Sequence, residues 1–442
     1  MELIENFFGF REKGTSFKTE TIAGLTTFMT MAYIIFVQPA VLSQAGMDFG
    51  AVMMATCLSA AIATLVMGLY ANYPIGVAPA MGENFFFVFT VVLGMGLAWQ
   101  KALGAVFISG ALFVALTAFR IRELIVDAVP QSLKDSIAGG IGLFIAFIGL
   151  LQAGIIEKST EGILSLGDLR KEPVLLSIFG LIFTAVLMSR KITGAILIGI
   201  IVSTILGLLL GIVNYPGSVL SLPPSILPTF LKVDIKGALE IDFLTVTIVF
   251  LFMVMFDTIG TLIGVAGIAG FLRNGKLPRA GRALMADAVG TSVGALLGTS
   301  TVTAYIESTT GVSQGGRTGF VCVVIAILFL LSILFFPLVK MIGGGYEISK
   351  GVFIYPLTAP ALVIVGSLMI QTIKNVRWDD FTEGIPAFLT LIGIPFTFSI
   401  ADGLCFGFIS FPIIKLLSGK GKTVSWLVYL LGALSIMRFL FA

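Results

Sequence analysis

Histidine is absent from this chain of 442 residues, and charged residues make up only 12% of it. A soluble globular protein carries about 25% charged residues, so the composition excludes an ordinary soluble domain. Because no imidazole is available, any proton that the protein handles has to be held by a carboxylate. The three cysteines, Cys57, Cys322 and Cys405, all lie in apolar runs, which indicates small core residues rather than disulfides or a metal site.

Other absences limit the function further. The sequence contains no arrangement of a nucleophile with a base and no cluster of metal ligands, so we predict that it is not an enzyme and needs no cofactor or metal. The net charge is only +3 and comes from basic loops, which does not indicate a nucleic-acid partner. What remains abundant is apolar sequence.

Long apolar runs dominate the chain. Hydrophobic residues make up 57% of it and the mean hydropathy is +1.07. The runs at 102–119, 174–188 and 318–338 reach or approach the ~20 apolar residues that cross a bilayer as a helix. We therefore predict an all-α polytopic membrane protein with the lipid bilayer as its surroundings.

The pattern of runs predicts about fourteen spans, grouped in two sets of seven. Basic residues such as Arg190 and Lys191 follow the even-numbered spans, which places both termini in the cytoplasm. The tail after Lys422 could be a half-span, an interfacial helix or a fifteenth span. The predicted spans are 20–43, 51–71, 80–98, 104–125, 132–155, 173–190, 193–213, 243–270, 283–299, 303–316, 318–340, 353–373, 381–399 and 401–417. The predicted units are a cytoplasmic segment (1–19), a first repeat (20–213), an extracellular loop (214–242), a second repeat (243–417) and an apolar tail (418–442).

The third span of each set is short and interrupted. GLYANYPIGVAPAMGENFF (68–86) and GTSTVTAYIESTTGV (298–312) each follow a span rich in small residues, continue as a polar or Pro-containing stretch, and resume near a glutamate, Glu83 or Glu307. Seven is odd, so the two halves would insert in opposite directions, and paired interrupted segments indicate the binding site of a transporter. We expect 75–79 and 302–305 to run extended toward each other near the midplane, and half-helices to begin near Met81 and Ile306.

Among the carboxylates within the predicted spans, where a charge costs ~2.5–3.5 kcal/mol on insertion scales, the five candidates for a function are Glu83, Asp257, Asp287, Glu307 and Asp402. Asp287 could hydrogen-bond a neighbouring helix, Glu83 could cap its half-helix, and Asp402 lies near a span end, where a charge can reach the interface. Glu307 and Asp257 have no such simple structural explanation. We predict that Asp257, Glu307, Asp287 and Glu83 are the candidates for proton coupling.

A carboxylate beside exposed backbone amides also limits the ligand. The carboxylate accepts N–H donors and the amides donate to carbonyl oxygen or ring nitrogen, so the pair fits a flat, neutral heterocycle such as a nucleobase. Glu307 and Asp257 would repel an inorganic anion. Phe85, Phe86 or Tyr305 could supply an aromatic wall.

Four stretches carry a family resemblance: GLTTFMTMAYIIFVQP (24–39), NYPIGVAPAMGENFFF (72–87), FDTIGTLIGVAG (256–267) and AYIESTTGVSQGGRTG (304–319). At these residues the chain resembles the nucleobase:cation symporter-2 family, also called nucleobase–ascorbate transporters, and in particular its AzgA-like purine permease branch. The resemblance implies two inverted seven-span repeats, a core domain of spans 1–4 and 8–11, and a gate domain of spans 5–7 and 12–14. It also implies coupling to protons, or in some members sodium, and frequent dimers.

The resemblance also assigns roles to residues. It places the substrate-holding carboxylate on Glu307, backbone contacts on Tyr305 and Ile306, the acidic residue of the eighth span on Asp257, and the third-span contact near Asn84 and Phe85. Thr261 stands where uracil-type members have a histidine, which argues against a uracil-type site. Glu83 departs from the branch, which usually has an apolar residue there.

Together these observations predict a secondary active transporter of the cell membrane that imports adenine, guanine or hypoxanthine with a proton, by alternating access. The alternatives on the same fold are xanthine, uracil or an anion such as sulfate. A channel would also contain broken helices, but it would show neither saturation nor ion coupling.

Overall fold

The structure is a computed structural model that describes residues 2–119, 129–158, 163–271, 277–349 and 352–441. In the first half of the chain, helix α5 continues into a π-helical segment, Met67–Ala71, and α6 continues into another, Phe86–Gly94. The elements of this half are α1 (Glu2–Phe8), α2 (Phe10–Lys13), α3 (Phe17–Met31), α4 (Ile34–Leu42), α5 (Phe49–Val66), β1 (Val77–Pro79), α6 (Met81–Phe85), α7 (Trp99–Ala118), α9 (Gln131–Gln152), β2 (Ile156–Lys158), β3 (Leu164–Leu166), α10 (Glu172–Ser189) and α11 (Ala195–Leu209).

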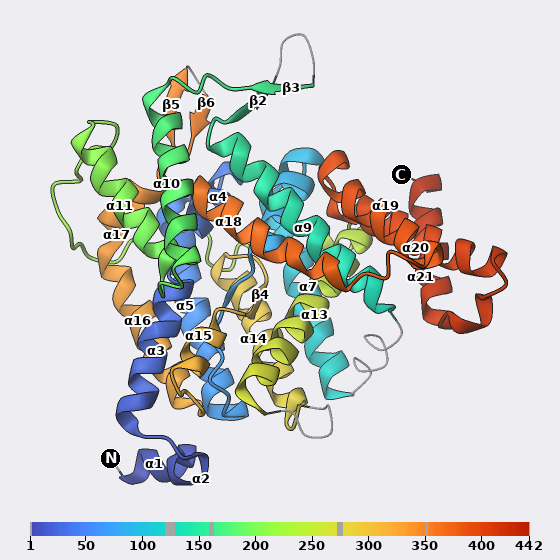
Figure 1. Ribbon diagram of the computed structural model, residues 1–442, viewed down its shortest axis with the longest axis horizontal. Helices are drawn as coiled ribbons and strands as arrows, with labels where there is room; N and C mark the ends of the chain where they lie inside the picture. Colours follow the sequence, from blue (N-terminus) through green and yellow to red (C-terminus); the bar gives the residue numbers. More distant parts are fainter. Residues whose placement is uncertain (1, 120–128, 159–162, 272–276, 350–351, 442) are drawn as a thin grey trace.

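The second half contains the longest helix of the described chain, α13, with 29 residues. Figure 1 shows α13, α14 and β4 near the centre of the molecule, and the N-terminal helices at one end. The elements of this half are α12 (Ile235–Ala238), α13 (Ile241–Ala269), α14 (Ala280–Leu297), β4 (Val302–Ala304), α15 (Ser308–Ser313), α16 (Phe320–Ser332), α17 (Phe336–Gly343), β5 (Tyr346–Ser349), β6 (Val352–Ile354), α18 (Ala359–Met369), α19 (Phe381–Thr397), α20 (Ile400–Leu417) and α21 (Trp426–Phe441).

Helical segments occupy all fourteen predicted spans. Eight helices among the described residues are long and apolar enough to cross a membrane, and five shorter apolar helices accompany them. The third and tenth spans are interrupted as predicted, by β1 and β4. The end of the predicted fourth span, 120–125, lies outside the described residues. The tail forms one helix of 16 residues, α21, which packs on α20.

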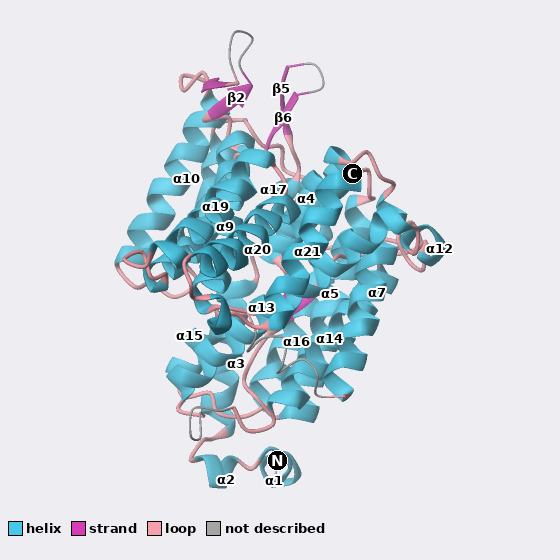
Figure 2. Cartoon of the chain, turned by 90° about the vertical axis from the view of Figure 1, so that its right-hand side faces the viewer, coloured by secondary structure: helices cyan, strands magenta, loops and turns pink. Residues whose placement is uncertain are grey.

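The predicted start of the twelfth span is wrong. Residues 352–354 form strand β6, which pairs with β5 in a hairpin, and the helix begins only at Ala359. Pro360 in the first turn is well placed to begin a helix because its missing N–H would have no partner there. The hairpin β5–β6 and the hairpin β2–β3 lie at the end of the molecule opposite to the N-terminal helices (Figure 2).

The two interruptions meet as a short antiparallel ribbon in the interior. β1 pairs with β4, with Val77 opposite Ala304 and Pro79 opposite Val302. Two further backbone bonds extend the ribbon, from Ala80 N–H to the Thr301 carbonyl (2.9 Å) and from Tyr305 N–H to the Gly76 carbonyl (2.9 Å). All three residues of each strand are buried. The ribbon therefore satisfies the backbone groups that an interrupted span would otherwise leave unpaired in the membrane.

Two buried threonines hold the ribbon from equivalent positions in the two halves. Thr64 on α5 donates its hydroxyl to the Val77 carbonyl (2.8 Å) and accepts from the Val77 N–H (3.0 Å). Thr291 on α14 makes the same two bonds with Val302, at 3.0 and 3.1 Å. Val77 and Val302 are thus related by the local two-fold axis of the ribbon.

This equivalence shows that the two glutamates do not occupy equivalent positions. Because Val77 corresponds to Val302 and the ribbon pairs Ala80 as it pairs Tyr305, the residue that corresponds to Glu307 is Gly82. Glu83 corresponds to Ser308. Glu83 stands six residues after Val77 and Glu307 five after Val302, so the two glutamates differ by one position in the repeat.

Replacing Thr291 by valine is expected to destabilise the folded protein by about 1–3 kcal/mol, because the change leaves a buried N–H and a buried carbonyl of Val302 without that partner. Thr64→Val should cost a similar amount. Thr56→Val in the same helix as Thr64 is the matched control, since Thr56 donates only to the carbonyl one turn earlier, on Val52. Thermal unfolding in detergent checks this, and equal effects of Thr56→Val and Thr64→Val would contradict it.

The helices pack in two groups. In one, α5 packs on α4, α14 and α16, and α7 packs on α13 and α14. In the other, α9 packs on α18 and α19, α19 on α20, and α10 on α11 and α18. Close backbone approach requires glycine at these contacts. A Cβ on Gly319, at the start of α16, would lie 2.0 Å from the Gly68 carbonyl oxygen.

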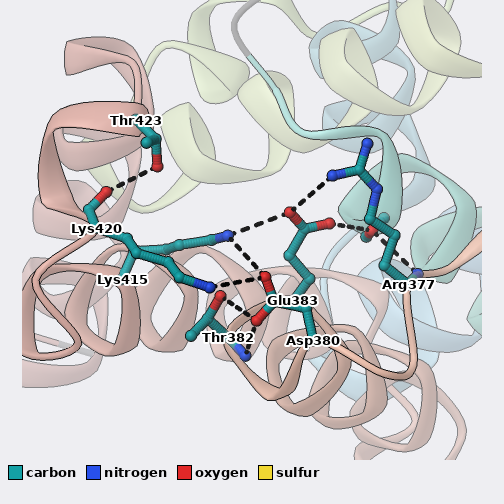
Figure 3. Close-up of polar contacts among 8 residues, drawn as sticks. Arg377, Asp380, Thr382, Glu383, Lys415, Lys420 and Thr423 are labelled. Carbon is teal, nitrogen blue, oxygen red and sulfur yellow. Dashed lines mark hydrogen bonds and ion pairs between the residues drawn. The ribbon is translucent and has the colours of Figure 1, made fainter.

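An ion network joins α9, α19 and α20 at one end of the second group (Figure 3). The buried Lys415 ammonium lies 3.1 Å from Glu383 Oε1 and 3.7 Å from Asp380 Oδ2, and Lys420 lies 3.1 Å from Asp380 Oδ2. Ser132 on α9 donates to Glu383 Oε2 at 2.7 Å. A buried lysine is tolerated only when it is paired, so the network fixes the end of α20 against the first turn of α19.

The network predicts a loss of stability in acid. Hydrogen bonds from the Thr382 hydroxyl and N–H, and from Lys420, hold the pKa of Asp380 well below its ordinary value of 3.8. The stabilisation by a carboxylate with a lowered pKa is present above the ordinary value and is lost as the pH falls below it. The unfolding temperature of the wild type should therefore fall more steeply below about pH 4 than that of Asp380→Asn. Parallel curves for the two proteins would contradict this expectation.

Candidate functional site

Glu307 stands directly after the ribbon, at the residue that precedes α15. Its side chain is partly exposed, and the Tyr33 hydroxyl donates to its Oε1 at 2.8 Å. Tyr33 lies at the break between α3 and α4, so a second irregular point of the backbone faces the carboxylate. A carboxylate can accept about four hydrogen bonds over its two oxygens. One bond from Tyr33 therefore leaves capacity for an N–H donor from a ligand.

Asp257 lies on α13 and faces the ribbon. The Thr303 hydroxyl donates to its Oδ2 at 3.0 Å, so β4 fixes the orientation of this carboxyl group. Like Glu307, Asp257 is partly exposed. Of the two predicted carboxylates, Asp257 thus contacts β4 from α13, and Glu307 stands in the chain that follows β4.

Tyr305 connects these groups. It is buried, its hydroxyl donates to the Pro79 carbonyl, and it lies close enough to Glu307, Asp257 and Glu83 to interact electrostatically with all three. The next residue, Ile306, is 48% exposed although Tyr305 before it is buried, and it lies near Gly264 on α13. The structure therefore brings Tyr305, Ile306, Glu307 and Asp257 close together in the interior. At this place Ile306, Glu307 and Asp257 are at least partly exposed.

Asn84 and Phe85 lie within the protein core. The Asn84 amide pairs with the amide of Gln38 on α4, and it also accepts from the Ser300 hydroxyl. Gln38 donates further to Thr299 (2.8 Å). Phe85 is fully buried and stacks on Phe89, with ring centroids 5.6 Å apart. In this arrangement the two side chains position α6 against the chain before β4.

Asp287 and Thr261 are also buried. Asp287 on α14 accepts from the Ala304 N–H at 3.0 Å, so its carboxylate supports β4 from the side of the ninth span. The sequence allowed Asp287 a structural role, a hydrogen bond to a neighbouring helix. The structure shows a hydrogen bond of this kind, but to strand β4. Thr261 lies one turn after Asp257 on α13, in the same helix.

Glu83 is the least explained carboxylate. It lies in the first turn of α6, is 2% exposed, and its Oε1 has no hydrogen-bond partner among the described residues. Its charge interacts with that of Asp257. A buried carboxyl group with an unpaired oxygen is far cheaper to keep when it carries a proton.

Sequence reasoning missed the hydroxyl groups of the site. Tyr33 stands in the apolar run MTMAYIIF, and Thr303 stands in the extended stretch of the tenth span. The only signal for Tyr33 is that a buried phenol needs a hydrogen-bond partner. Which partner it finds depends on the fold.

Interrupted helices of opposite orientation meet in a buried ribbon with carboxylates beside it, which is the arrangement expected at the binding site of a membrane transporter. The transmembrane domain of the cyanobacterial bicarbonate transporter BicA superposes with a TM-score of 0.62 over 88% of this chain and 96% of that domain, at 14% sequence identity. The structure therefore has the fold of two inverted seven-span repeats, as predicted.

The chain belongs to the xanthine/uracil permease family, whose model, described as "Permease family", matches residues 18–404. It is 44% identical to the adenine permease AdeP of Escherichia coli, over 99% of this chain and 96% of that protein. It is also 44% identical to the guanine/hypoxanthine permease PbuG of Bacillus subtilis, over 99% of this chain and the whole of that protein. Family membership confirms the predicted resemblance and the prediction of a multi-pass membrane transporter.

Proposed function

We propose that the protein imports a purine base, adenine, guanine or hypoxanthine, and that Glu307 is the group that holds it. The observation that carries the proposal is the partly exposed Glu307 carboxylate, oriented by Tyr33 at the end of the buried ribbon. A purine presents a ring N–H to such an acceptor. The identity to adenine and guanine/hypoxanthine permeases supports the same ligand class.

In the proposed site the base lies beside Ile306, in the space between the start of α15 and the start of α6. Backbone groups of Tyr305 and Ile306 bind its edge. Asn84, Phe85 and Thr261 shape the site from behind, because their side chains are buried.

We infer that Asp257 carries the coupling proton. Among the candidate carboxylates it is partly exposed and is held by the Thr303 hydroxyl, whereas Asp287 is fully buried and supports the Ala304 N–H. Glu83 contributes a further acidic group near Asp257. Protonation from outside precedes binding of the base, and both ligands leave inside.

The two helix groups supply the moving parts of this cycle. The group around α5, α7, α13 and α14, which bears the ribbon, acts as the core, and the group around α9, α18 and α19 acts as the gate. Contacts of α6 with α9 lie between them. The proposal includes a cytoplasmic-membrane location with both termini inside, and the homodimer that the family resemblance implies.

The experiment that tests the function is uptake of radiolabelled adenine, guanine, hypoxanthine, xanthine and uracil into proteoliposomes, with and without an inward proton gradient. We expect saturable uptake of at least one of the first three, with accumulation only when the gradient is present. Uptake of uracil alone, or of no base by protein shown to be folded, would overturn the proposal.

A further inference from the structure

A cavity opens at the end of the molecule that carries the N-terminus. Its volume is about 510 Å³, which falls in the range of small-molecule sites. Three segments form its wall: the helices α1 and α2, the Asn72–Tyr73 link between the second span and β1, and the residues on both sides of the connection from α13 to α14.

The N-terminal segment is firmly docked where it forms this wall. Phe8 and Phe10 are buried against Phe320, each with ring centroids 5.7 Å from it. The Asn72 amide donates to the Phe8 carbonyl (3.2 Å) and accepts from the Gly319 N–H (2.6 Å). The cavity is therefore built by packed elements.

Two cations converge on an aromatic wall of the cavity. The Arg279 guanidinium lies over the Tyr73 ring (4.9 Å to its centroid), and the Lys13 ammonium lies over the Phe271 ring (5.7 Å). The two rings are themselves 5.5 Å apart, so both cations face the same pair of rings. A guanidinium that stacks on a ring keeps its N–H edge available for an oxyanion.

These cations have no acidic partner in the part of the chain that the structure describes, since neither forms an ion pair there. Among the lining residues that the structure describes, Glu12 is the one carboxylate, and its Oε2 turns back toward Gly9, 3.4 Å from the position of a Cβ there. Arg279 also adopts the left-handed backbone, with φ of 59°, which non-glycine residues rarely do. The cavity is thus positive, aromatic and open to a ligand.

We propose that this cavity binds a phosphate-bearing ligand, and that a ligand with a purine ring, a nucleoside monophosphate, fits it best. The phosphate would pair with Arg279 and Lys13, and the ring would lie on the apolar wall that Phe7 and Phe271 contribute. The headgroup of an anionic phospholipid offers the same phosphate chemistry and is the alternative source.

The location gives the ligand a way to regulate transport. Tyr73 stands four residues before β1, so a ligand that joins Tyr73 to the N-terminal helices restrains the chain that enters the ribbon. This step rests on the proposed function. A nucleotide made from an imported base would then lower further uptake.

Binding can be tested without transport. Radiolabelled guanosine monophosphate is titrated onto the purified full-length protein in detergent, and guanosine, inorganic phosphate and short-chain phosphatidylglycerol serve as competitors. We expect saturable binding that Arg279→Gln weakens by at least about tenfold, with guanosine a far weaker competitor. Arg282→Gln is the matched control, because Arg282 stacks on Tyr70 in the same way (5.4 Å) but does not line the cavity.

The results of this titration distinguish a nucleotide from a lipid headgroup as the source of the phosphate. Binding of the nucleotide that depends on Arg279 supports the proposal, and so does binding of phosphatidylglycerol alone with the same dependence, which identifies a lipid headgroup. The proposal is overturned if neither phosphate-bearing probe binds to folded protein, or if Arg279→Gln and Arg282→Gln affect binding equally. Because no gradient or uptake is involved, failure here leaves the transport proposal intact.

Discussion

Glu307→Gln is expected to reduce gradient-driven purine uptake by about 100-fold at subsaturating substrate. The glutamine keeps a carbonyl oxygen for the Tyr33 hydroxyl but turns one acceptor into a donor, which then faces a ring N–H of the base. A hydrogen bond to a charged group contributes about 1.5–3 kcal/mol, and a repelled donor adds to that loss. Initial rates in proteoliposomes measure the effect.

Two further variants sharpen this result. Tyr33→Phe removes only the bond that orients the carboxylate, so it should reduce uptake by about tenfold or less. Glu172→Gln, at the exposed first turn of α10, is the control for loss of a carboxylate and should leave uptake unchanged. Near wild-type uptake by Glu307→Gln would contradict the assignment of the substrate group.

Asp257→Asn is expected to abolish accumulation while allowing exchange. In a one-proton symport, a gradient of one pH unit is worth about 1.4 kcal/mol and drives about tenfold accumulation of substrate. Asparagine keeps an acceptor for the Thr303 hydroxyl but cannot take up the proton. The accumulation ratio should therefore fall to about 1, whereas base-for-base counterflow continues.

Asp287→Asn is the comparison for this variant. Its amide oxygen can still accept from the Ala304 N–H, so accumulation should persist. Loss of accumulation in Asp287→Asn, with accumulation retained in Asp257→Asn, would contradict the assignment of the proton to Asp257.

Much of the architecture could be predicted because lipid imposes strong constraints. Apolar runs of span length predicted where the helical segments lie. The backbone N–H and C=O groups near Pro79 and in the polar stretch before Glu307 had to find hydrogen-bond partners inside the protein. This is why the two stretches pair as β1 and β4. Intramembrane charge is costly, so Glu307 and Asp257 stood out.

The rest depended on tertiary partners that no local pattern records. Asn84, which the resemblance places near the substrate, pairs with Gln38, which lies 46 residues away in the chain. Val352–Ile354 is as apolar as a span, but it forms strand β6, which pairs with β5 in a hairpin. Glu83 and Glu307 both follow an interruption, and only the strand register shows that Gly82, not Glu83, is the position equivalent to Glu307.

Equilibrium binding of a radiolabelled purine base to the purified protein tests the central claim most directly. Wild-type protein in detergent should bind guanine, hypoxanthine or adenine saturably at one site per chain, with competition among the three and none from sulfate. Glu307→Gln should lose this binding while its unfolding temperature stays close to that of the wild type. Equal binding by folded wild type and Glu307→Gln, or binding by neither, would contradict a purine site at this carboxylate.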